Sequence, residues 1–238
     1  MAHAEAVVTM RRLAFIPARE HSRRLSGKNL AAVGGKSLVR RAVEIAIEAR
    51  ALGVVDDVVT SVEDWETREE AQRAGATAVS RATHLRAPET TVLDVLKAHL
   101  ADAPEIDLVC LLLPTSPLRT LRHIVESRLL LRERVDAVMS VTPFRQDVDY
   151  ALHVVDDGMI VRHEACCPHG AAWEDHRYWK HDGHVLWGRT AWLSKARNLY
   201  DGRLVPYAIP PDASSDIDTA LDLAWCDFLL ARGARAHD

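Results

Sequence analysis

Cationic side chains gather in one short segment near the start of the chain, directly after an apolar run. The segment carries Arg19, Arg23, Arg24 and Lys28, and the apolar run is 13–16. In open α/β sheets, ligands bind at the carboxyl ends of the strands. Cationic side chains and loop amides at that edge can neutralise phosphate groups. The segment therefore predicts a phosphate-binding loop, although charge alone favours a solvated basic loop equally well.

Two aspartates near the other end of the chain could hold a metal ion. Asp216 and Asp218 are two residues apart, and in an extended segment this spacing places both side chains on one face. Two such carboxylates can hold Mg²⁺ that is also bound to phosphate oxygens. The alternative is that Asp218 caps a helix beginning at Thr219, and the two roles can coexist.

A second glycine-containing segment resembles the end of a P-loop but does not complete that motif. The segment is Gly34-Gly35-Lys36-Ser37, and Leu30 stands where the motif needs another glycine. It also does not directly follow an apolar strand. We interpret it as a glycine turn before a helix that begins near Ser37.

The order of apolar patterns predicts an α/β fold with three layers and a mostly parallel sheet. Buried strands are expected first at 13–16, 57–60, 76–79, 108–113 and 136–141. Helices are expected between and after them at 37–52, 65–74, 91–100 and 121–134. The alternation then stops, and the remaining pattern predicts a hairpin of 152–155 with 159–161, a long polar loop at 163–182, strands at 185–187 and 204–208, and a helix at 219–231.

Composition bounds the class of protein. The chain has 238 residues, a net charge of −4 and 27% charged residues, which suits one large domain. No basic tail predicts nucleic acid binding, and the apolar runs are too short to span a bilayer. The absence of a signal-peptide pattern and the presence of four cysteines favour the cytoplasm. We expect a disordered tail at 1–12 and one domain at 13–238, with an insertion at about 144–182.

Several segments together resemble one enzyme family. They are Ile-Pro-Ala-Arg at 16–19 followed by Lys28-Asn29, Leu-Leu-Leu-Pro-Thr-Ser-Pro-Leu-Arg at 111–119, Asp-Ile-Asp-Thr at 216–219, and the Asp-Gly strand at 181–187. In order and spacing these resemble the acylneuraminate cytidylyltransferase family, over about 13–231. The resemblance implies a Rossmann-like nucleotidyltransferase fold with a small β-containing extension through which members of the family dimerise.

The resemblance also implies an activity and a set of site residues. Similar enzymes use Mg²⁺ and transfer CMP from CTP to a small acidic acceptor, here a 2-keto-3-deoxy sugar of the sialic acid type, with release of pyrophosphate. The matching catalytic positions are Arg19, Lys28, Asp216 and Asp218, the last two also as metal ligands. The matching nucleotide-binding positions are Ala18, Arg19, Ser22, Lys28, Asn29, Pro114 and Thr115. The matching acceptor-binding positions are Leu113, Ser116, Arg119 and His184.

The chain departs from the family pattern at the acceptor side. Leu113 replaces a glutamine that is associated with acceptor contacts, and a leucine cannot make those hydrogen bonds. This leaves open another acceptor, such as a phosphonate or other small acid, and a catalytically inactive nucleotide-binding relative. For the His- and Cys-rich stretch 163–184, the resemblance implies an acceptor-binding segment. A zinc site and a partly exposed loop that packs on a dimer mate are the alternatives. We expect two cysteines and four tryptophans to serve in packing, namely Cys110, Cys226, Trp65, Trp187, Trp192 and Trp225.

Overall fold

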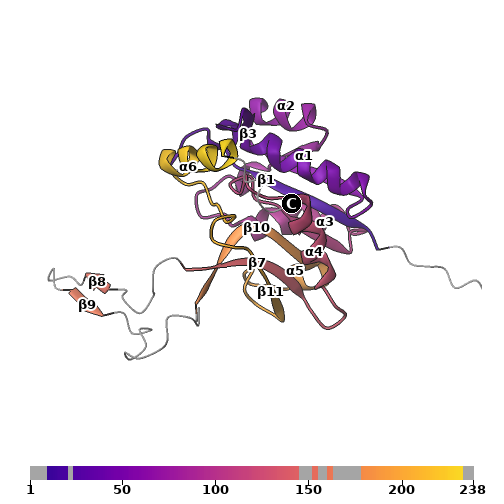
Figure 1. The fold of residues 1–238 in the computed structure, drawn as a ribbon. Helices are drawn as coiled ribbons and strands as arrows, with labels where there is room; N and C mark the ends of the chain where they lie inside the picture. The colour runs from indigo at the N-terminus through magenta and orange to yellow at the C-terminus, as the bar shows by residue number, and fades with distance from the viewer. Residues whose placement is uncertain (1–9, 21–23, 145–151, 155–159, 163–177, 233–238) are drawn as a thin grey trace, which may run out of the picture.

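The computed structural model describes residues 10–20, 24–144, 152–154, 160–162 and 178–232. Its centre is a sheet of seven strands in the order β11-β7-β10-β6-β1-β4-β5, covered by helices (Figure 1). The strands β1 (Arg12–Ala18), β4 (Asp57–Val62), β5 (Thr77–Ser80) and β6 (Leu108–Leu111) pair in parallel. The predicted α/β class and mostly parallel sheet are confirmed.

One antiparallel strand completes the sheet. β10 (Trp179–Arg189) lies between β6 and β7 (Ala137–Pro143) and runs antiparallel to both. Its register against β7 shifts between His181 and Leu186, which is a bulge of the kind found next to active sites. The edge strand β11 (Leu204–Ala208) is parallel to β7.

Helices cover both faces of the sheet, so the three layers are also confirmed. One apolar cluster joins the sheet to α1 (Leu38–Ala51), α2 (Trp65–Arg73) and α4 (Leu121–Leu129). The other joins it to α3 (Val92–Ala101) and α5 (Thr190–Leu193). The four longer of these helices begin at a residue whose side chain accepts from the first turn, namely Ser37, Asp64, Thr91 and Thr120.

A third, smaller cluster brings the two ends of the chain together. Val33 of β2 (Ala32–Val33) and Leu38 pack against Ile217 and against Cys226 of α6 (Ala220–Ala231). β2 pairs with β3 (Lys36–Ser37), just after the short helix η1 (Lys28–Leu30). This packing places the segment before α6 beside the loop that follows β1 (Figure 1).

Several expected boundaries were wrong. β10 begins at Trp179 and not at 185, because residues 179–181 already pair with β7 before the bulge. α4 ends at Leu129 and not at 134. The tail does not extend to residue 12, since the main-chain N–H of Arg11 bonds to Asp107 and β1 starts at the next residue. The short elements β2, β3, η1, η2 (Thr83–Leu85) and α5 were not expected.

Other expectations are confirmed. β8 (Leu152–Val154) and β9 (Ile160–Arg162) form the antiparallel hairpin, and Cys110 and Cys226 are buried. Trp187 is a core residue, but Trp65 and Trp225 are exposed, so packing was the wrong interpretation for those two. No described helix is both long enough and apolar enough to cross a membrane.

Candidate active site

The cationic loop and the two late aspartates line the same pocket, which has a volume of about 420 Å³. The pocket lies at the carboxyl ends of β1 and β6. All four residues expected to act in catalysis line it, together with neighbours from three segments of the chain: Pro17, Arg19, Arg24, Lys28, Asn29, Val92, Leu113, Pro114, Thr115, Asp216 and Asp218. The expected convergence of the cations with the carboxylates is therefore present in the fold.

Lys28 is the cation most firmly placed in the pocket. Its Nζ donates to Asp218 Oδ1 at 3.1 Å and to the main-chain carbonyl of Ile217 at 2.9 Å. Its side chain is 16% exposed. Arg24 forms a second ion pair with Asp218 from the solvent side. Gly27 makes this placement possible, because its φ of 63° turns the chain into η1 in a conformation that favours glycine.

Asp218 is not the cap of the last helix, so that alternative was wrong. The cap is Thr219, which forms a capping box with Asp222. Asp222 also accepts from the main-chain N–H of Asp218. The carboxylate of Asp218 is thus left to face the pocket. Ile217, buried between the two aspartates, donates its N–H to the carbonyl of Thr115 at 2.9 Å and ties them to the opposite wall.

The loop after β1 is held by main-chain contacts. The side-chain amide of Asn29, which is buried, donates to the carbonyl of Arg19 at 2.7 Å. The guanidinium of Arg19 donates to the carbonyls of Ala87 and Pro88. Asn29 therefore shapes the loop besides lining the pocket.

Two expected nucleotide-binding positions differ from the rest. Ala18 is buried at the end of β1 and is not part of the pocket lining, whereas the preceding Pro17 is. Ser22 lies outside the described residues.

A buried ion pair that sequence analysis missed supports the same loop. Glu63 and Arg81 are 5% exposed or less, with Oε1 and a guanidinium nitrogen 2.6 Å apart. The other carboxylate oxygen of Glu63 accepts from the N–H of Glu20 at 3.1 Å. Burial lowers the pKa of Arg81, which the charge of Glu63 partly offsets. In the sequence, the available signal for this pair was a charged residue directly after a strand. The signal does not identify the partner, because the pairing depends on the register of the sheet.

The opposite wall of the pocket is the turn 113–116, and here the expectations hold in part. Leu113, Pro114 and Thr115 line the pocket. Ser116 and Arg119 are buried and are not among its lining residues. Ser116 Oγ donates to the carbonyl of Asp182 at 3.2 Å.

Arg119 joins this turn to the bulge of β10. Its guanidinium donates to the carbonyls of Leu113, Gly183 and His184. Burial lowers its pKa to about 10. Ser116 and Arg119 thus support the wall from behind, and their expected contact with the acceptor stays a prediction.

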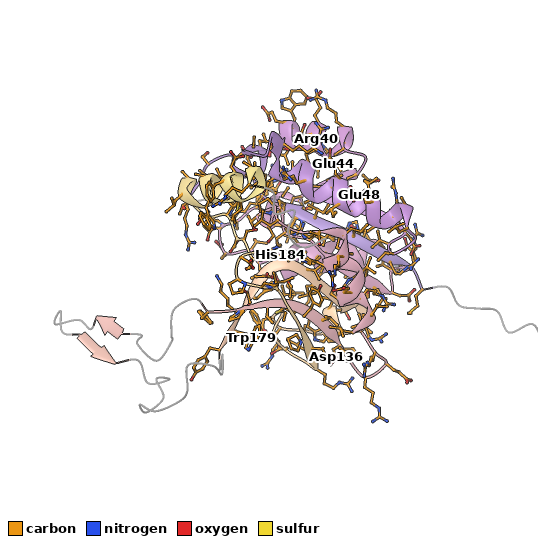
Figure 2. All side chains as sticks on the ribbon, viewed as in Figure 1. Arg40, Glu44, Glu48, Asp136, Trp179 and His184 are labelled. Carbon is orange, nitrogen blue, oxygen red and sulfur yellow. The ribbon has the colours of Figure 1, made fainter. Side chains whose placement is uncertain are left out.

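His184 is likewise interior (Figure 2). It belongs to a buried polar network. Its Nδ1 lies 3.0 Å from Asp182 Oδ2, and Asp182 Oδ1 accepts from Ser140 Oγ at 2.6 Å. Burial acts to raise the pKa of Asp182, but hydrogen bonds from His184 and Ser140 outweigh burial and hold that pKa well below its usual value. His184 therefore lines neither pocket, and its expected contact with the acceptor stays a prediction. The network links β7 to β10 beneath the wall.

The pocket offers a suitable donor set for a hard divalent cation. Asp216 and Asp218 both face it, and carboxylate oxygens are ligands that Mg²⁺ prefers. Within the described part of the chain, no three His, Cys, Asp or Glu side chains form a group that could hold a metal. The two aspartates therefore fit an ion that takes its remaining ligands from phosphate and water. Residues 163–177 of the His- and Cys-rich stretch lie outside the described residues.

Curated relatives align over almost the whole chain. CMP-N,N'-diacetyllegionaminic acid synthase of Legionella pneumophila is 27% identical over 230 residues, covering 93% of this chain and 97% of that protein. Pseudaminic acid cytidylyltransferase of Campylobacter jejuni is 26% identical over 229 residues, covering 92% and 96%. N-acylneuraminate cytidylyltransferase of Streptococcus agalactiae is 26% identical over 225 residues, which span 52% of that protein.

Solved structures share the fold. The CTP complex of CMP:2-keto-3-deoxy-manno-octonic acid synthetase has a TM-score of 0.70 at 18% identity and covers 93% of this chain and 99% of that one. 4-Diphosphocytidyl-2C-methyl-D-erythritol synthase of Anaerococcus prevotii has a TM-score of 0.66 at 14% identity, covering 94% and 97%. The model of the family described as Cytidylyltransferase matches residues 13–150. The chain belongs to the cytidylyltransferase family.

Proposed function

We propose that the chain transfers CMP from CTP to an acidic 2-keto-3-deoxy sugar and releases pyrophosphate. The observation that carries the proposal is the pocket in which Arg19, Arg24 and Lys28 face Asp216 and Asp218. A triphosphate and its cation need this combination of charges. Two relatives that align over more than nine tenths of the chain act, by their names, on legionaminic and pseudaminic acids, which supports an acid as the acceptor.

The chemistry needs positioning and charge neutralisation more than a covalent nucleophile. The anomeric hydroxyl of the sugar attacks the α-phosphorus, a new P–O bond forms, and the bond to the bridging oxygen of the leaving pyrophosphate breaks. Negative charge grows on that leaving group. Lys28 and Arg24 both pair with Asp218. When a triphosphate binds, they can release this carboxylate and bind phosphate oxygens instead. Arg19 lines the same pocket but is partly engaged with the loop 87–88.

Magnesium belongs to the proposal as the cofactor. Asp216 and Asp218 would hold it, and when bound it would offset charge on the phosphate oxygens. We include a homodimer formed through the region 144–182, as in similar enzymes, which light scattering of the purified chain can test. A cytoplasmic location is also proposed, since the four cysteines fit a reducing compartment.

The direct test measures pyrophosphate release. The purified chain is incubated with CTP and magnesium and with a panel of acids: eight- and nine-carbon 2-keto-3-deoxy sugar acids, phosphonates and simple hydroxy acids. We expect release with at least one sugar acid and its loss on addition of EDTA. Release of pyrophosphate with the phosphonates alone would mean that the acceptor is a phosphonate and not a sugar acid. CTP binding without release under any acceptor would indicate an inactive relative.

A further inference from the structure

A second pocket adjoins the phosphate-binding pocket. Its volume is about 180 Å³, less than half that of its neighbour. Asp216 lines both pockets and stands at their boundary. The second pocket is bounded by the end of β7, the start of β10 and the start of α6. A ligand in it would therefore lie beside the proposed metal ligands and next to the phosphates of a bound nucleotide.

The second pocket has one cationic side chain among its lining residues. Lys180 lines it from β10 and is exposed. It pairs directly with Thr142 in the antiparallel register of β7 and β10, so the two side chains lie on the same face of the sheet. Lys180 and Thr142 are therefore cross-strand neighbours, and both line the pocket.

One buried hydroxyl in the pocket wall lacks a hydrogen-bond partner. Thr142 Oγ1 has no partner within the described residues, and Thr142 is 2% exposed. A buried hydroxyl without a partner costs free energy, and native proteins leave few of them. Thr142 lines the pocket. A ligand with acceptor oxygens would satisfy its hydroxyl.

We infer that this second pocket holds the carboxylate end of the acceptor acid, with Lys180 as the cation that recognises it. The inference rests on the proposed function. In a 2-keto-3-deoxy acid the carboxyl group is attached to the carbon that bears the reacting hydroxyl. A carboxylate at Lys180 therefore places that hydroxyl near Asp216, at the opening into the phosphate pocket. The small volume suits this end of the sugar, and the rest of the molecule extends outward past Trp225.

The first experiment separates acceptor binding from nucleotide binding. In Lys180→Gln, the KM for the sugar acid should rise about ten- to hundredfold, because a charge-assisted hydrogen bond is lost. The affinity for CTP, measured by calorimetry without acceptor, should not change. Lys195→Gln is the matched control, since Lys195 is also exposed and lines neither pocket. An unchanged KM in Lys180→Gln, with wild-type turnover, would overturn the inference and leave the proposed function intact.

The second experiment uses the unpartnered hydroxyl. Thr142→Val removes it with little change in volume, so the melting temperature should stay the same or rise. In Thr142→Val the KM for the acid should rise several-fold. The wild-type enzyme should prefer the acid to its amide, and Lys180→Gln should lose this preference. A higher KM together with a lower melting temperature would instead indicate a structural role for Thr142. If wild-type protein binds CTP but releases no pyrophosphate with any acid, the proposed function fails and this inference fails with it.

Discussion

Lys28 and Asp218 meet across the pocket although 190 positions separate them in the chain, with Nζ donating to Oδ1 at 3.1 Å. Arg24 pairs with the same carboxylate. An incoming triphosphate is a stronger partner for both cations than one carboxylate is. We therefore expect an exchange in which the cations move to phosphate oxygens and Asp218 becomes available to the metal ion.

Asp218→Asn tests the metal half of this exchange. The variant keeps the shape of the side chain but loses its charge, so turnover at saturating CTP and magnesium should fall by about 100-fold or more. Binding of Mn²⁺ in the presence of CTP, followed by electron paramagnetic resonance, should weaken in parallel. Asp227→Asn is the control, because Asp227 lies on α6 outside the pocket and its amide oxygen can still accept from Gly34. Wild-type turnover in Asp218→Asn would remove Asp218 from the metal site.

Lys28→Ala tests the cationic half, and Lys36→Ala is its internal comparison. Lys28 faces the pocket, so its loss should lower kcat/KM for CTP by about ten- to hundredfold. Lys36, in the segment that resembles a P-loop, pairs with Glu44 on the surface at 2.6 Å and is not a lining residue. Its removal should leave CTP kinetics unchanged. Steady-state kinetics with varied CTP compare the two variants. A loss of kcat/KM in Lys36→Ala with normal kinetics in Lys28→Ala would favour the P-loop interpretation.

The sequence was sufficient for the architecture and for the charged residues that face the pocket. The alternation of short apolar runs with helical patterns is a local property, and the phosphate loop and the paired aspartates carry their charges in one segment each. It was not sufficient for the acceptor wall. Whether Arg119 faces a ligand or three carbonyls depends on the bulge between His181 and Leu186, and no local pattern encodes a register shift between distant strands. The pair of Glu63 with Arg81 was missed for the same reason.

Arg119→Met tests the assignment of Arg119 to support of the wall. The variant leaves the carbonyls of Leu113, Gly183 and His184 without this donor in a buried place. The free energy of unfolding should fall by about 3 kcal/mol or more. Arg122→Met should change it by less than about 0.5 kcal/mol, because Arg122 is 66% exposed and pairs with Glu126 on the same helix. Urea denaturation measures both. Unchanged stability of Arg119→Met with a raised acceptor KM would return Arg119 to acceptor binding.

The network behind the wall predicts a specific pH dependence of stability. Burial lowers the pKa of His123 to about 4, and the neighbouring His184 and Arg119 act in the same direction, whereas Asp182 and Glu126 oppose them. Between pH 6.5 and 4 the unfolded chain therefore binds a proton that the folded chain does not, so stability falls as the pH falls. The loss is at most about 3 kcal/mol. The low pKa of Asp182 acts in a separate window, because the stability it contributes is lost only below the usual carboxyl pKa.

His123→Gln isolates this effect. His123 Nδ1 accepts from the N–H of Thr120 in the capping box of α4, and a glutamine at that position can accept the same bond. The variant should therefore fold and should lose the part of the slope of the unfolding free energy between pH 6.5 and 4.5 that His123 contributes. His99 and His181, whose pKa values are also lowered by burial, should keep their own contributions. His84→Gln, at an exposed position, should keep the wild-type slope. Urea denaturation at several pH values compares the three proteins. An unchanged slope in His123→Gln would mean that His123 is protonated in the folded state.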